Sequence, residues 1–138
     1  MRLFDINGKL KNKNVSNFLI KWDAKSRSNI QFTTKQFLKK YWFGYVVYEE
    51  FPVFGTRLKV DIVNASQKIA IEVNGFQHES FNKFFHDNSR ANYLKSIKRD
   101  LTKIKWLEMN KFKVIEINED EIKLLSKEFF LEKFNVLL

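Results

Sequence analysis

Between residues 45 and 74 the sequence alternates apolar and polar side chains in three successive runs, with a short polar break between one run and the next. Alternation with a period of two is typical of β-strands, so the pattern predicts strands over residues 45–54, 56–63 and 68–74. Connections this short join antiparallel neighbours. The pattern therefore predicts a three-strand meander around which the rest of the chain must pack.

Helical patterns lie on both sides of this meander. Apolar residues recur at spacings of three and four over residues 89–109, which predicts a long amphipathic helix. Thr33 and Thr34 are candidate caps for a helix that ends at Gly44, and residues 15–22 are a further helical candidate. Residues 112–117 resemble a fourth strand, and residues 119–138 one or two short helices. The predicted fold class is α/β, an α+β mixed sheet with a meander, a long helix and a further strand.

The chain has few residues that could divide it. It contains one proline and four glycines among 138 residues, which is the length of one ordinary domain. We expect a single domain with a basic helical N-terminal region over residues 1–44, a core over 45–118 and C-terminal helices over 119–138. Because there is no apolar signal core and no run of about 20 apolar residues, we also expect a soluble, intracellular, cytoplasmic protein without a membrane partner.

Three acidic residues are evenly spaced within the predicted meander. A two-residue hairpin loop at positions 55–56 places Glu50 opposite Asp61, and a turn over positions 64–67 places Asp61 opposite Glu72. Directly opposed residues share one face of a sheet, about 5 Å apart at Cβ. The apolar residues between them then point to the other face. We therefore expect one face to be core and the other to carry a row of carboxylates.

Neighbouring carboxylates repel one another, so a positive charge should lie among them. A hard divalent cation with oxygen ligands, Mg²⁺ or Mn²⁺, fits a chain that has no cysteine and two histidines. The alternative is that these acids balance nearby lysines on a solvated face. His78 weighs against it, because Gly75 allows a sharp turn that brings a general acid or base back towards the carboxylates.

The same residues carry a family resemblance. The segments concerned are Asp61-Ile62-Val63, Ile71-Glu72-Val73-Asn74-Gly75-Phe76-Gln77-His78, Arg99-Asp100 and Phe112-Lys113-Val114-Ile115-Glu116-Ile117. In this order they resemble the PD-(D/E)XK nuclease superfamily, with a restriction-endonuclease-like core. Within it the chain is most similar to the very-short-patch-repair-like branch and to phage-associated EDxHD homing endonucleases. The similarity covers residues 45–117, so it implies that the core is catalytic.

The resemblance implies catalytic roles for Glu50, Asp61, Glu72, His78, Asp100, Gln77 and, as the alternative to Glu50, Glu49. The hairpin register favours Glu50 over Glu49. Asp100 could instead balance Arg99 or Lys103 on the helix surface. The chain also departs from the family pattern: Asn74 stands where the motif has its lysine, so His78 would have to compensate.

The implied reaction is metal-assisted hydrolysis of a phosphodiester. The bound ion would polarise the phosphate and lower the pKa of a water molecule. His78 would move the proton, Asp100 would orient its ring, and Gln77 would position substrate or water. The implied metal ligands are Asp61, Glu72, the carbonyl of Val73, and Glu50.

The charge balance points to a polyanionic partner. Twenty-five Lys and Arg against sixteen Asp and Glu give a net charge of +9. Basic side chains contact phosphates without reading bases, so they would give salt-sensitive affinity for double-stranded DNA. A long specific site would then need a homodimer, the N-terminal region or readout of DNA shape. The candidate nucleic-acid contacts are Lys25, Arg27, Asn74, Lys95 and Arg99.

These observations predict a metal-dependent DNA endonuclease, a phage-type homing enzyme that nicks or cuts double-stranded DNA. A structure-selective nuclease that acts on junctions or mismatches is the second interpretation. The third is a catalytically silent DNA-binding module of the same fold. Such a module has no need of the acidic row together with His78, and neutralising its carboxylates should strengthen its binding to DNA.

Overall fold

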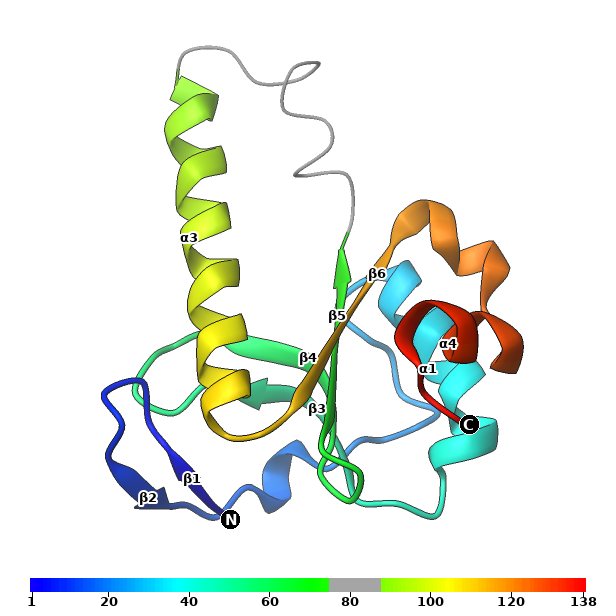
Figure 1. Ribbon diagram of the computed structural model, residues 1–138, viewed down its shortest axis with the longest axis horizontal. Helices are drawn as coiled ribbons and strands as arrows, with labels where there is room; N and C mark the ends of the chain where they lie inside the picture. The colour runs from blue at the N-terminus through cyan, green and yellow to red at the C-terminus, as the bar shows by residue number, and fades with distance from the viewer. Residues whose placement is uncertain (75–87) are drawn as a thin grey trace.

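The computed structural model describes residues 1–74 and 88–138 (Figure 1). Its elements, in chain order, are β1 (Arg2–Phe4), β2 (Leu10–Asn12), the 3-10 turn η1 (Ser16–Phe18), α1 (Asn29–Trp42), β3 (Val47–Pro52), β4 (Lys59–Asn64), β5 (Ile69–Asn74), α3 (Asn88–Met109), β6 (Lys113–Asn118), the 3-10 helix η2 (Glu119–Leu124) and α4 (Lys127–Phe134). This order confirms the predicted fold class, with its three-strand meander, long helix and further strand.

The main sheet has the order β3-β4-β5-β6. β3, β4 and β5 are antiparallel neighbours, and β6 returns beside β5 in the parallel direction, with α3 between them in the chain. Phe51 lies opposite Val60, and Ile62 lies opposite Ile71, so both predicted registers are confirmed. These pairings bring the acid-bearing positions of β3, β4 and β5 to the same end of the sheet.

The loop between β3 and β4 is wider than predicted. The Val53 N–H donates to the Leu58 carbonyl at 2.9 Å, so the loop spans residues 54–57 rather than the expected positions 55–56. The Thr56 N–H closes a turn on the Val53 carbonyl at 3.0 Å, and Gly55 has a φ of +93°, which glycine adopts without a Cβ penalty. The loop is centred on the same two residues as the predicted turn, so the register is unchanged.

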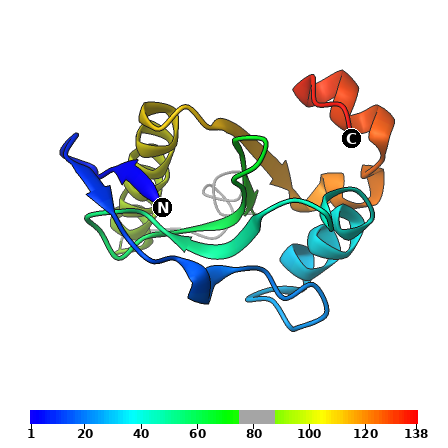
Figure 2. The same cartoon turned by 90° about the horizontal axis from the view of Figure 1, so that it is seen from below.

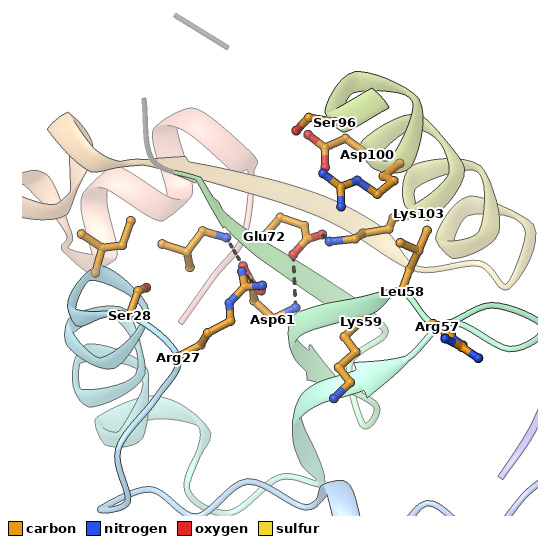
Figure 3. Close-up of a pocket in the computed structure, with 13 residues that line it drawn as sticks. Arg27, Ser28, Arg57, Leu58, Lys59, Asp61, Glu72, Ser96, Asp100 and Lys103 are labelled. Carbon is orange, nitrogen blue, oxygen red and sulfur yellow. Dashed lines mark hydrogen bonds and ion pairs between the residues drawn. The ribbon is translucent and has the colours of Figure 1, made fainter. Parts of the chain in front are cut away.

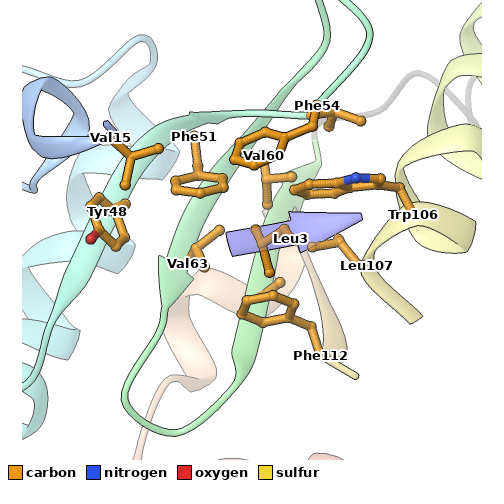
Figure 4. Close-up of a cluster of buried hydrophobic side chains, with 12 residues drawn as sticks. Leu3, Val15, Tyr48, Phe51, Phe54, Val60, Val63, Trp106, Leu107 and Phe112 are labelled. Atoms are coloured by element: carbon orange, nitrogen blue, oxygen red, sulfur yellow. The ribbon is translucent and has the colours of Figure 1, made fainter. Parts of the chain in front are cut away.

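Helices cover both faces of the sheet (Figures 1 and 2). α3 and the β1–β2 hairpin lie on one side, and α1 and α4 lie on the other. The core on the α3 side is shown in Figure 4 and comprises Leu3, Val15, Tyr48, Phe51, Val53, Phe54, Val60, Val63, Ala70, Trp106, Leu107 and Phe112. The core on the α1 side comprises Leu38, Trp42, Val47, Ile62, Ile69, Ile71, Val73, Ile115, Ile117, Phe130 and Val136.

The predicted division into one apolar face and one acidic face is wrong. Val60 belongs to the core on the α3 side and Ile62 to the core on the α1 side, so both faces of the sheet are packed. Regular pairing is interrupted in β3, where Glu50 has a φ of +52° and lies between the paired residues Glu49 and Phe51. The acids therefore lie where the sheet ends beside α3, not along an open face.

The segment over residues 15–22 is not the predicted helix. It forms the single 3-10 turn η1 and then runs along the outer edge of β3. Leu19 bridges Tyr48, and the Ile20 N–H donates to the Val47 carbonyl at 2.9 Å. Without residues 19–20, the backbone groups on the outer edge of β3 would be unpaired. Residues 15–22 pair with this edge instead of forming the helix that their local pattern predicts.

α1 begins earlier than the sequence predicted. Ser28 is its cap, and the Ser28 hydroxyl accepts a hydrogen bond from the Gln31 N–H at 3.2 Å. Thr33, one of the predicted caps, lies inside the helix and donates to the Asn29 carbonyl at 2.9 Å. The earlier start matters for the site because it places the residue before the cap, Arg27, at the edge of the sheet.

Residues 1–44 are only partly helical, because a β-hairpin precedes α1. Its first strand is tied to the end of α3: the Phe4 N–H donates to Asn110 Oδ1 at 2.8 Å, and the Phe4 carbonyl accepts from Trp106 Nε1 at 2.6 Å and from Asn110 Nδ2 at 3.1 Å. These partners are more than 100 residues away in the chain, so local sequence gives no sign of them.

At the C-terminus η2 and α4 confirm the predicted short helices. Ser126 caps α4 by accepting from the Phe129 N–H at 3.0 Å, and Phe130 is fully buried against α1. Among the helices in the described parts of the chain, none has both the length and the apolar character that a membrane span requires.

Candidate active site

Asp61 and Glu72 form a buried carboxylate pair on the adjacent strands β4 and β5 (Figure 3). Only 2% of Asp61 and 7% of Glu72 are exposed. The Asp61 N–H donates to Glu72 Oε2 at 3.1 Å, and the Val73 N–H donates to Asp61 Oδ2 at 2.8 Å. Each carboxylate thus accepts a backbone hydrogen bond from the strand that carries the other. Both side chains are fixed beside one another, as the predicted register requires.

The electrostatics of this pair are unfavourable for two negative charges. Burial raises the pKa of Asp61 from its ordinary value of 3.8 to about 8, and repulsion from Glu72 adds to the shift. The hydrogen bond from the Val73 N–H and the nearby Arg27 charge act in the opposite direction. The site as it stands therefore favours a proton on Asp61 and would favour any added cation.

Two basic side chains already approach the acids. The guanidinium of Arg27 lies 3.4 Å from Asp61 Oδ1 and 3.6 Å from Glu50 Oε1. The ammonium of Lys103 lies 2.8 Å from Glu72 Oε1. The sequence predicts Arg27 as a contact to nucleic acid, and Lys103 as one of the basic residues on the long helix that contact phosphates or balance Asp100. Both instead lie at the carboxylates.

The structure separates the roles of Glu49 and Glu50. Glu49 is held in a hydrogen-bonded network, in which one oxygen accepts from Ser26 Oγ at 2.6 Å and from Gln31 Nε2 at 2.9 Å, and the other accepts from Lys35 Nζ at 3.0 Å. Glu50 shares Arg27 with Asp61, and its Oε2 is buried without a hydrogen-bond partner among residues 1–74 and 88–138. Glu50 is therefore the member of the pair that has an oxygen available at this end of the sheet.

The network around Lys35 positions the Arg27 loop. The Lys35 side chain is fully buried, and its ammonium also donates to the carbonyls of Lys21 at 3.0 Å and Ala24 at 2.7 Å. These carbonyls belong to the loop that precedes α1. A buried ammonium with three acceptors thus joins α1, β3 and this loop, and fixes the backbone that carries Arg27.

A cleft of about 550 Å³ opens over the acid pair between the sheet and α3 (Figure 3). α3 contributes residues 96, 99, 100 and 103, a spacing that places them on one face of a helix. Val73 and two serines also line the cleft. Its charged lining residues are the acids Asp61, Glu72 and Asp100 and the bases Arg27, Arg57, Lys59, Arg99 and Lys103.

The other predicted residues that the structure describes lie on α3, at the end of β5 and on the loop before α1. Arg99 and Asp100 line the cleft with the acid pair. Lys95 is exposed and lines a neighbouring hollow on α3 that shares Arg99, and Lys25 is exposed on the loop before α1. Asn74 is the last residue of β5. Gln77 and His78 lie outside the described residues.

A hard divalent cation such as Mg²⁺ is bound in proteins by carboxylate and carbonyl oxygens. Within residues 1–74 and 88–138, no three Asp, Glu or His side chains come together as a metal-binding group. The acidic side chains at this end of the sheet offer oxygen ligands, and Glu50 Oε2 is a buried carboxylate oxygen that lacks a hydrogen-bond partner in the described part of the chain. Burial and repulsion from Glu72 raise the pKa of Asp61, so an added cation would stabilise the charged form of this carboxylate. These properties fit a hard ion such as Mg²⁺ or Mn²⁺.

Comparison with known proteins gives one partial match. No protein-family model matches this chain. A stretch of 40 residues is 42% identical to "Uncharacterized protein 033L" of Invertebrate iridescent virus 3. This match covers 29% of the present chain and 21% of the viral protein, so the chain is similar to about a fifth of that protein's length.

Proposed function

We propose that this protein is a metal-dependent DNA endonuclease that hydrolyses phosphodiester bonds, a phage-type homing enzyme that nicks or cuts double-stranded DNA. The observation that carries the proposal is the buried Asp61–Glu72 pair in the wall of a cleft whose rim is basic. A buried acid pair is costly to the fold, and such costs concentrate at functional sites. The observed element order is also the one that the resemblance to PD-(D/E)XK nucleases implies.

The basic lining suits a nucleic-acid backbone. Arg57 and Lys59 are exposed on the β4 side of the cleft, and Arg99 lines the same cleft from α3. Such side chains bind phosphates of any sequence. A phosphate held between them would lie over the acid pair, which is the position that hydrolysis needs.

In the proposed reaction, water gives its oxygen to phosphorus and the P–O bond to one sugar oxygen breaks. One hydrogen of the water ends on the leaving sugar oxygen and the other is released as a proton. Asp61, Glu72, the Val73 carbonyl and Glu50 would hold Mg²⁺ or Mn²⁺, which when bound polarises the phosphate and lowers the pKa of water. His78 is proposed to move the proton, with Gln77 and Asp100 positioning water and the ring.

The proposal is tested with supercoiled plasmid in Mg²⁺ and in EDTA. We expect metal-dependent nicking that Asp61→Asn and Glu72→Gln each reduce by at least about 100-fold, because each removes a ligand charge. Binding to a labelled duplex in Ca²⁺, measured by fluorescence anisotropy, should be retained. Glu132→Gln is the matched control, since Glu132 is exposed on α4, on the other side of the sheet.

Three outcomes would change the proposal. Equal nicking by both site variants would remove these acids from the mechanism. Binding without cleavage by the wild-type protein, with tighter binding by Asp61→Asn, would indicate a silent DNA-binding module. Cleavage confined to junction or mismatched substrates would indicate a structure-selective nuclease.

A further inference from the structure

Among the described residues, Lys103 is the basic side chain that most closely approaches the acid pair. Its ammonium lies 2.8 Å from Glu72 Oε1, and only 14% of its side chain is exposed. It projects from α3 into the same cleft that Asp61 and Glu72 line (Figure 3). A largely desolvated ammonium is held in place by its ion pair, and its electrostatic effect on nearby groups is stronger than in water.

Arg27 is more exposed than Lys103 and lies farther from its carboxylate partners. Its side chain is 66% exposed and lies 3.4 Å and 3.6 Å from its two carboxylate partners. Long contacts at an exposed side chain are easily exchanged for water or phosphate. Arg27 can therefore leave the acids when another cation or a phosphate arrives, whereas Lys103 is anchored by its helix and by its short contact to Glu72.

We propose that Lys103 is a catalytic residue of the phosphodiester hydrolysis proposed above, on which this inference rests. Its ammonium would contact a non-bridging phosphate oxygen and neutralise the charge that builds up there while the bond from water forms and the bond to the sugar oxygen breaks. Lys103 keeps its proton and forms no covalent bond in this step. A fixed cation needs no rearrangement as that charge develops, which is the condition for a large effect on the rate.

The competing account is that Lys103 only balances Glu72 until a metal ion binds. The two accounts predict opposite results for Lys103→Met. A mere counter-ion competes with the metal, so its removal should strengthen metal binding and leave cleavage unchanged or faster. A catalytic ammonium acts on the phosphate, so its removal should slow cleavage even at saturating metal.

The experiment compares the wild-type protein with Lys103→Met, Lys103→Gln, Lys103→Arg and Lys105→Met. Lys105 lies on the same helix, is exposed and does not line the cleft, so it is the matched control. Single-turnover cleavage of a labelled duplex is measured at saturating Mg²⁺. Mn²⁺ binding without DNA is measured by calorimetry, duplex binding in Ca²⁺ by anisotropy, and folding by circular dichroism. Lys103→Gln keeps a polar group beside Glu72 and serves if Lys103→Met does not fold.

We expect Lys103→Met and Lys103→Gln to lower the single-turnover rate by about 10²–10³-fold, the loss typical of removing one group that stabilises transition-state charge. Mn²⁺ binding should not weaken, and duplex affinity should change by less than about threefold. Lys103→Arg should recover the rate to within about tenfold of wild type, because the charge is restored, and Lys105→Met should match wild type.

Wild-type cleavage rates in both charge-removing variants would overturn this inference and leave the proposed function intact. Loss of Mn²⁺ binding in step with cleavage would also overturn it, because Lys103 would then act through the metal ligands alone. Absence of metal-dependent cleavage by the wild-type protein would overturn the proposed function and this inference together.

Discussion

At the scale of single residues, Asp61 holds a carboxyl group where burial and a neighbouring acid both oppose its charge. Its raised pKa, about 8, means that the folded protein keeps a proton that the unfolded chain, with a pKa near 3.8, releases. The stability linked to this proton is fully present below about pH 4. It is lost progressively as the pH rises towards 8.

Asp61→Asn removes this titration while keeping the shape of the side chain. In EDTA, the unfolding free energy of Asp61→Asn minus that of wild type should therefore increase by about 1.4 kcal/mol per pH unit between about pH 5 and pH 7. Urea denaturation followed by circular dichroism gives both values. A difference that stays constant over this range would contradict a raised pKa for Asp61.

The acids of the site were predictable from the sequence, and the cations were not. Strand register follows from the positions of the turns and from the apolar pattern, so Asp61 and Glu72 could be placed side by side from their spacing. The approach of Lys103 depends on how α3 packs across β5 and β6, and helical periodicity does not tell which polar residue will face the sheet. The hairpin register favours Glu50 over Glu49 as the acid of the site, and that choice stays a prediction. The left-handed backbone of Glu50 had no sequence signal.

At the scale of elements, long regular patterns were predicted well and tertiary hydrogen bonds were not. α3 and β6 were placed to within one residue, because their apolar residues repeat with a clear period. Residues 15–22 were mispredicted as a helix because their conformation depends on partners elsewhere: the edge of β3 for Leu19 and the Lys35 ammonium for the carbonyl of Lys21.

Lys35→Met tests the hydrogen bonds by which the Lys35 ammonium joins α1 to β3 and to the loop that precedes α1. It removes a fully buried charge and leaves two carbonyls and Glu49 without that donor, so we expect the unfolding free energy to fall by about 3–5 kcal/mol. Lys39→Met is the matched control one turn along α1. Its ion pair with Asp23 is exposed, so its loss should cost less than about 1 kcal/mol. Equal losses in urea denaturation would show that the buried network does not hold the loop.

At the scale of the whole molecule, the site is assembled from parts far apart in the sequence. Arg27 comes from the loop on the α1 side, Asp61 and Glu72 come from the two central strands β4 and β5, and Lys103 comes from α3 on the other side. Both layers of helices must therefore dock before the cleft exists. The chain as a whole carries a net charge of +9, whereas the centre of the site is acidic. The net positive charge favours the attraction of a polyanion from a distance.

The salt dependence of duplex binding should report which charges meet the phosphates. The logarithm of the association constant falls with the logarithm of salt by about 0.9 for each phosphate neutralised. The double variant Arg57→Ala/Lys59→Ala should therefore reduce this slope by about 1.8, as measured by anisotropy in Ca²⁺. Lys9→Ala/Lys11→Ala, two exposed positions in the N-terminal hairpin region, should leave it unchanged. An equal salt dependence of binding in both double variants would show that the DNA phosphates do not contact Arg57 and Lys59.

The left-handed backbone at Glu50 sets a limit on how this chain could be made more resistant to heat. A side chain with a Cβ costs about 1–2 kcal/mol in that conformation, and glycine would remove the cost. The same replacement would delete the carboxylate that shares Arg27 with Asp61. Thermal stability and the proposed role of Glu50 as a metal ligand therefore favour different residues at position 50, and selection for melting temperature alone would favour the loss of this acid.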